Sequence, residues 1–172
     1  GGTPSLVNSK YIAQVLEEIN RKFKLSKDAE ITIEINPGTV NKEKILEYKE
    51  IGINRISIGL QSTNVRILDL IGRIHNYSKF LDTYNIVKDE FENINVDLMF
   101  AIPTQTEKEL IDSLYKVINL KPTHISIYSL IVEENTPIKQ MLDSKVLEYI
   151  DEETERKMYW KTKKILENNG FN

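Results

Sequence analysis

Four short segments of this 172-residue chain alternate aliphatic with polar or small residues, and this feature limits the possible folds most strongly. The segments are residues 31–36 (ITIEIN), 55–61 (RISIGLQ), 94–102 (INVDLMFAI) and 124–131 (HISIYSLI). Such alternation predicts β-strands. Stretches with helical spacing of apolar residues separate the strands, so strand and helix alternate along the chain and the strands are expected to be parallel.

Helices are predicted at 6–23, 41–51, 65–71, 80–87, 107–119, 137–149 and 151–169. In the last of these helices, Tyr159 and Trp160 are interpreted as core aromatics. No linker or low-complexity tract interrupts the pattern, so residues 1–172 are predicted to form a single α/β domain. An open doubly wound sheet and a barrel, or partial barrel, both fit this order of elements.

Composition excludes several functional classes. The formal net charge of -3 and the scattered lysines argue against nucleic acid as a partner. No apolar run approaches the length of a membrane span and no leader precedes the first helix, so we expect a soluble, cytoplasmic protein. The absence of cysteine excludes a thiolate metal site within these residues. Because the chain starts at Gly1 and ends just after a helix-stop signal, we expect a fragment truncated at both ends.

Polar side chains recur on one face of all four predicted strands. Glu34, Gln61, Asp97 and Tyr128 lie toward the ends from which the chain leaves for the next helix. Parallel α/β proteins place their ligand sites at these ends, and a packed barrel interior is normally filled with bulky branched residues. Two interpretations follow: the four residues face a polar ligand in an open barrel mouth, or each simply forms hydrogen bonds with its neighbours.

Two loop segments add candidate binding groups. Gly1-Gly2-Thr3-Pro4 precedes the first helix, where free backbone N–H groups can bind an anionic or zwitterionic ligand, although the same residues also suit a plain turn. Arg73 offers a forked donor for a carboxylate, or else is a solvated surface charge. His124 is interpreted as structural, while the position of His75 in a loop fits either role. The two histidines are too far apart in sequence to indicate a metal site.

Six blocks together resemble a known family: GGTPS at 1–5, ITIEINPGTV at 31–40, GINRISIGLQS at 52–62, GRIH at 72–75, VDLMFAIPTQT at 96–106 and HISIYSLIVEENTP at 124–137. In order and spacing they are similar to the radical S-adenosylmethionine (radical SAM) proteins of the oxygen-independent coproporphyrinogen III oxidase family. GLQS, GRIH and SLIVEENTP resemble the branch of radical SAM heme chaperones more than the decarboxylating oxidases.

The resemblance implies a partial (β/α)6 barrel that holds SAM and a [4Fe-4S] cluster, of which residues 1–172 would be the central part. It implies that Gly1, Gly2 and Thr3 contact the methionine part of SAM, and that Glu34, Gln61, Arg73 and Asp97 are further SAM-contacting residues. The resemblance also implies that the first strand and the CxxxCxxC cluster loop are missing, so that the fragment alone is inactive. Ala101 and Thr104 stand where glycine is common in the branch.

Three functions are compared on this basis. The first is a heme chaperone that binds heme or porphyrin and delivers heme to respiratory hemoproteins, and the sequence blocks favour it. The second is an enzyme that decarboxylates coproporphyrinogen III to protoporphyrinogen IX by radical chemistry. The third, an ordinary α/β enzyme without a cluster, applies only if the resemblance is accidental. No catalytic residue is assigned under any of the three.

Overall fold

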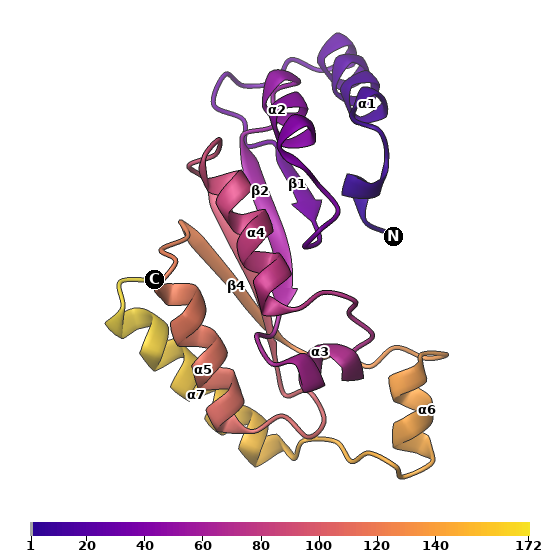
Figure 1. Ribbon diagram of the computed structural model, residues 1–172, viewed down its shortest axis with the longest axis vertical. Coiled ribbons are helices and arrows are strands. Elements are labelled where there is room, and N and C mark those ends of the chain that lie inside the picture. Colours follow the sequence, from indigo (N-terminus) through magenta and orange to yellow (C-terminus); the bar gives the residue numbers. More distant parts are fainter. Residues whose placement is uncertain (1) are drawn as a thin grey trace.

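The computed structural model describes residues 2–172, which form one sheet of four parallel strands in the order β1-β2-β3-β4 (Figure 1). The strands are β1 (Thr32–Ile35), β2 (Arg55–Gln61), β3 (Ile94–Phe100) and β4 (His124–Ser129). All three neighbouring pairs are parallel. The predicted α/β class and the parallel strands are therefore confirmed. Of the two architectures that fit the sequence, the sequential strand order is that of a barrel segment rather than of a sheet that doubles back.

Helices follow each strand, and a side chain caps the amino end of every α-helix in the described residues. They are η1 (Pro4–Leu6), α1 (Ser9–Lys22), α2 (Lys42–Glu50), α3 (Val65–Leu70), α4 (Tyr77–Lys88), α5 (Glu107–Ile118), α6 (Pro137–Asp143) and α7 (Glu152–Asn168). The cap of α5 is a complete capping box between Thr106 and Glu109.

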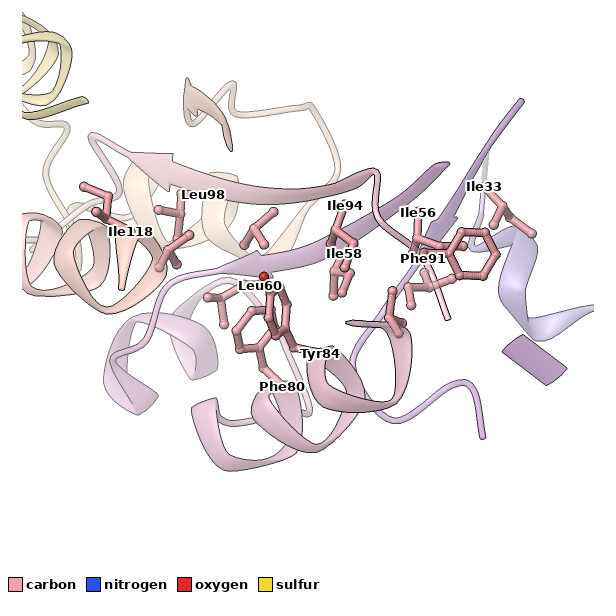
Figure 2. Packing of buried hydrophobic residues seen from close by; sticks show 14 of the residues in the cluster. Ile33, Ile56, Ile58, Leu60, Phe80, Tyr84, Phe91, Ile94, Leu98 and Ile118 are labelled. Carbon is pink, nitrogen blue, oxygen red and sulfur yellow. The ribbon is translucent and has the colours of Figure 1, made fainter. Parts of the chain in front are cut away.

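The core lies between the aliphatic face of the sheet and the helices α2, α4 and α5. Figure 2 shows Phe80 and Tyr84 reaching from α4 toward Ile58 and Leu60 on β2. These four side chains are at most 1% exposed. Burial of this face leaves the opposite face of the strands for polar residues, because successive side chains of a strand point to opposite sides.

Several element boundaries differ from the sequence prediction. The first α-helix begins at Ser9, because Pro4–Leu6 forms a separate 3-10 turn and the Asn8 side chain caps the helix by accepting from the Lys10 N–H at 3.0 Å. α6 was predicted to reach residue 149 but ends at Asp143. Two residues later, Lys145 adopts a positive φ of 57°, which a continuing helix does not allow. Strand β3 ends at Phe100, and the next residue, Ala101, has a positive φ of 55° that turns the chain away from the strand direction.

The interpretation of Tyr159 and Trp160 as core aromatics is wrong. Their exposed fractions are 50% and 57%, whereas Met158 and Thr162 on the same helix are buried. A helix turns by about 100° per residue, so the face that places Met158 and Thr162 toward the rest of the domain turns the next two positions outward. The two rings pack edge to face against each other, with 5.4 Å between their centroids. Within residues 2–172, no helix combines the length and the apolar character that a membrane crossing requires.

Candidate functional site

The polar strand faces meet at one cavity of about 230 Å³ at the carboxyl ends of the strands. It is lined by Gly2, Thr3, Glu34, Ile35, Asn36, Gly59, Gln61, Arg73, Asp97 and Tyr128. Every predicted site residue that the structure describes is in this set, while Gly1 lies outside the described residues. The structure thus brings together side chains from β1, β2, β3 and β4 and from two loops.

Asn36, at the end of β1, connects the two loops at the cavity. Its Nδ2 donates to Thr3 Oγ1 at 2.7 Å, and its Oδ1 accepts from Arg73 Nη1 at 3.2 Å. Arg73 is half-buried and directed at the cavity rather than being a freely solvated surface charge. One amide side chain thus links Thr3 in the N-terminal segment and the Arg73 guanidinium to the end of β1.

Gln61 owes its position to a break in the strand pairing. The register between β2 and β3 shifts between Gly59 and Gln61, and Gln61 has a φ of 69°, a left-handed conformation that is strained for a residue other than glycine. The buried Gln61 side chain accepts a hydrogen bond at Oε1 from the Tyr128 hydroxyl at 3.2 Å. The irregularity thus directs an amide into the cavity floor.

His75 supports this irregular backbone and does not itself line the cavity. It is buried, and its Nε2 lies 3.1 Å from the carbonyl oxygen of Leu60, the residue before Gln61. Burial lowers the pKa of His75, so the imidazole is neutral at pH 7 and Nε2 carries the proton that it donates to this carbonyl. Of the two roles considered from the sequence, the geometry is that of a structural histidine.

Gly59 lines the floor of the cavity, at a position where a Cβ would be crowded. A Cβ on Gly59 would lie 2.9 Å from Asn36 Oδ1 and 3.1 Å from Gln61 Nε2, both closer than ordinary van der Waals contact. The glycine therefore allows two amide groups from neighbouring strands to approach each other across the floor of the site.

Among residues 2–172, the charged groups at the cavity are two carboxylates, Glu34 and Asp97, and one guanidinium, Arg73. Asp97 is half-buried, whereas Glu34 is exposed at the mouth. Burial, and to a lesser extent the negative charge of Asp97, raise the pKa of Tyr128, so its hydroxyl keeps its proton. The arrangement suits a ligand that carries a carboxylate together with an ammonium or hydroxyl groups.

Residues 2–172 hold no group of three or more histidine, cysteine, aspartate or glutamate side chains placed to ligate a metal ion. The polar groups that line the cavity are instead amides, hydroxyls, carboxylates and a guanidinium. Such groups fit a polar zwitterionic molecule such as SAM. The glycine at position 59 keeps the cavity floor open, because a Cβ there would crowd the amides of Asn36 and Gln61.

Asn36, Gly59 and the polar residues behind Asp97 (Ser57, Asn95, His124 and Ser126) are not among the site residues predicted from the sequence. The alternation pattern placed all of them on the polar strand face, which was the signal available. The pattern does not predict that the Asn36 amide bonds to both Thr3 and Arg73. Nor does it predict the close approach of two amides that requires glycine at position 59.

Comparison with protein families gives a match to the radical SAM superfamily over residues 1–116. The chain is 44% identical to the heme chaperone HemW of Haemophilus influenzae over 137 residues, which cover 79% of this chain and 36% of the relative. It is 36% identical to the heme chaperone HemW of Bacillus subtilis over 161 residues, 92% of this chain and 42% of that protein. The chain thus spans less than half the length of these curated relatives.

Among solved structures, coproporphyrinogen III oxidase (HemN) from Escherichia coli, described as a radical SAM enzyme, has a TM-score of 0.82 and 23% sequence identity. The match covers 100% of this chain and 40% of that protein. The archaeal Elp3 of Methanocaldococcus infernus has a TM-score of 0.75 at 21% identity, covering 90% of this chain and 41% of that chain. At this level of identity the similarity establishes the fold alone.

Proposed function

The chain belongs to the radical SAM superfamily, and from this premise we propose that residues 1–172 are the SAM-binding central part of a longer heme chaperone. Membership in the superfamily implies SAM and a [4Fe-4S] cluster. In this proposal the four strands are a segment of a partial barrel that continues at both edges of the sheet, and residues 1–172 act as a single domain.

The proposed SAM site is the cavity at the carboxyl ends of the strands. Arg73 and the backbone of Gly1, Gly2 and Thr3 would hold the SAM carboxylate, since a guanidinium and free N–H groups are its natural partners. Glu34 and Asp97 would accept from the ammonium or the ribose hydroxyls, and Gln61 would add an amide contact. Bound to a reduced cluster, SAM supplies radical chemistry. The residues of this chain bind and orient it.

The cluster itself would depend on another part of the protein. The 172 residues contain no cysteine, and thiolates are the usual ligands of a [4Fe-4S] cluster. We therefore propose that the ligating cysteines lie outside residues 1–172. Anaerobic iron-sulfur reconstitution should give no cluster absorption with residues 1–172 and a stable cluster with the full-length protein. A stable cluster on residues 1–172 would contradict this assignment.

The observation that carries the chaperone proposal is the 44% identity to a heme chaperone over 137 residues. The oxidase alternative has the support of a similar fold at 23% identity, which many different activities share. We therefore propose heme or a related porphyrin as the cargo, and respiratory hemoproteins as the recipients.

The test uses the full-length, cluster-loaded protein in two parallel assays. The first titrates the protein with heme, followed by absorption, and then adds an apo-hemoprotein acceptor to measure transfer. The second supplies coproporphyrinogen III, SAM and a strong reductant under anaerobic conditions. Stoichiometric heme binding with transfer and no decarboxylation supports the chaperone. Formation of protoporphyrinogen IX would make the protein an oxidase and overturn the proposal.

A further inference from the structure

Behind the cavity, a hydrogen-bonded group of polar side chains joins β2, β3 and β4, with Asn95 and Ser57 buried at its centre. Its centre is Asn95 on β3, which is only 1% exposed. Asn95 Nδ2 donates to Asp97 Oδ1 at 2.6 Å and to Ser57 Oγ at 2.8 Å. Asn95 Oδ1 lies 2.6 Å from His124 Nδ1 and accepts from Ser126 Oγ at 3.0 Å. The amide thus uses both of its N–H donors and both acceptor positions of its oxygen.

The surrounding groups fix the orientation of this amide. Reversing it would bring the amide oxygen against the Asp97 carboxylate, where two acceptors would face each other without a proton. In the orientation present, the amide oxygen faces His124, so His124 Nδ1 must carry the proton of this hydrogen bond. The Asp97 carboxylate therefore fixes the orientation of the amide, and the amide oxygen in turn fixes the tautomer of His124.

The same group holds both oxygens of Asp97. Asn95 donates to Oδ1, and Ser57 Oγ donates to Oδ2 at 3.1 Å while itself accepting from Asn95. A carboxylate fixed at both oxygens cannot turn about its terminal bond without losing at least one hydrogen bond. The remaining acceptor positions of Asp97 are left for a ligand in the cavity that it lines.

We propose that Asn95 is a positioning residue that, with Ser57, orients the Asp97 carboxylate for the cationic or hydroxyl-bearing part of the ligand. This inference rests on the proposed SAM site, because it assigns a support to one of that site's residues. Asn95 lies behind Asp97 and acts through it. Preorganised donors of this kind reduce the ordering that a ligand would otherwise impose on binding.

The test is a double-mutant cycle on SAM affinity in the full-length, cluster-loaded protein, measured by anaerobic calorimetry. Asn95→Leu keeps the side-chain size and removes both donors, and should weaken SAM binding roughly tenfold or more, the scale of a hydrogen bond to a charged group. In the Asp97→Ala background the same change should alter the affinity by less than about twofold, because Asn95 acts only through Asp97.

A second variant keeps the test decisive if Asn95→Leu does not fold. Ser57→Ala removes the other donor to Asp97 and should also weaken SAM binding. Its matched control is Ser113→Ala, which deletes another buried hydroxyl, on α5, that is bonded to Thr63 and lies outside the cavity. Thermal melts of both serine variants should fall similarly, whereas only Ser57→Ala should lose affinity.

The possible outcomes distinguish the positioning role of Asn95 from the proposed SAM-binding function. Weaker SAM binding in Asn95→Leu that disappears in the Asp97→Ala background supports the positioning role. Equal losses in both backgrounds, or unchanged affinity in Ser57→Ala, would make these residues structural and overturn the inference while leaving the SAM site in place. If the cluster-loaded protein with no substitution does not bind SAM, the proposed function fails, and the inference fails with it.

Discussion

Substitution of Gly59 by alanine should weaken ligand binding without unfolding the protein. The new Cβ would lie 2.9 Å from Asn36 Oδ1 and 3.1 Å from Gln61 Nε2, where ordinary contact begins at 3.4 Å. The two amides must therefore move by about 0.5 Å and about 0.3 Å. The Asn36 amide is the acceptor for Arg73 at 3.2 Å, so its displacement disturbs the hydrogen bond that holds the guanidinium at the cavity.

The expected magnitude follows from this single contact. A hydrogen bond to a charged group contributes about 1.5 to 3 kcal/mol, so SAM affinity should fall by roughly ten- to 150-fold. The folding free energy should change little. Gly59 does not have a positive φ, and alanine at a compatible position stabilises a protein by about 0.4 to 1 kcal/mol through the unfolded chain, which offsets the local crowding.

Calorimetric SAM titration and a thermal melt of the full-length, cluster-loaded protein measure the two quantities. Gly52→Ala is the matched control, because Gly52 has a φ of +94° and, apart from its two chain neighbours, no residue in the described part of the chain has an atom within 4 Å of the position that its Cβ would take. It should lose about 1 to 2 kcal/mol of stability and keep its SAM affinity. If Gly59→Ala instead lowers the melting temperature by several degrees and leaves affinity intact, Gly59 serves packing and the argument for a built site is refuted.

Three further changes test the site and the core. Glu34→Gln removes the charge of an exposed side chain, so SAM affinity in calorimetry should fall by about 1.5 to 3 kcal/mol while the thermal melt stays unchanged; a lowered melt with intact affinity would make Glu34 structural. Tyr48 is fully buried, its hydroxyl has no hydrogen-bond partner among residues 2–172, and burial raises its pKa to about 12. The unfolded tyrosine ionises near pH 10, so the contribution of Tyr48 to stability is fully present below that pH and is lost as the pH rises toward 12. Tyr48→Phe should therefore reduce the loss of stability between pH 10 and 12 in urea unfolding. At pH 7 its stability should be equal or about 1 kcal/mol higher, because no buried hydroxyl is left without a partner at this position. Ala101→Gly should raise the unfolding free energy by up to about 1 kcal/mol in urea titrations, because Ala101 has a φ of 55°; a lower value would mean that the alanine methyl group packs usefully.

The sequence by itself determined the framework of this protein. Alternation within the four strand segments fixes which side chains face the helices, because successive residues of a strand point in opposite directions. The helical stretches between them require parallel strands, and parallel strands bring their carboxyl ends to one edge. The pattern therefore predicts Glu34, Gln61 and Asp97 at one edge of the sheet, and in the structure all three line one cavity.

Only the tertiary structure decided how the site is built. The left-handed turn at Gln61 depends on the pairing of β2 with β3 and on His75, fifteen positions from Leu60 along the chain. The direction of Arg73 depends on Asn36. The exposure of Tyr159 and Trp160 depends on which face of α7 meets its neighbours, since both are as apolar as core residues in the sequence. Each is set by contacts between distant residues, which local periodicity does not encode.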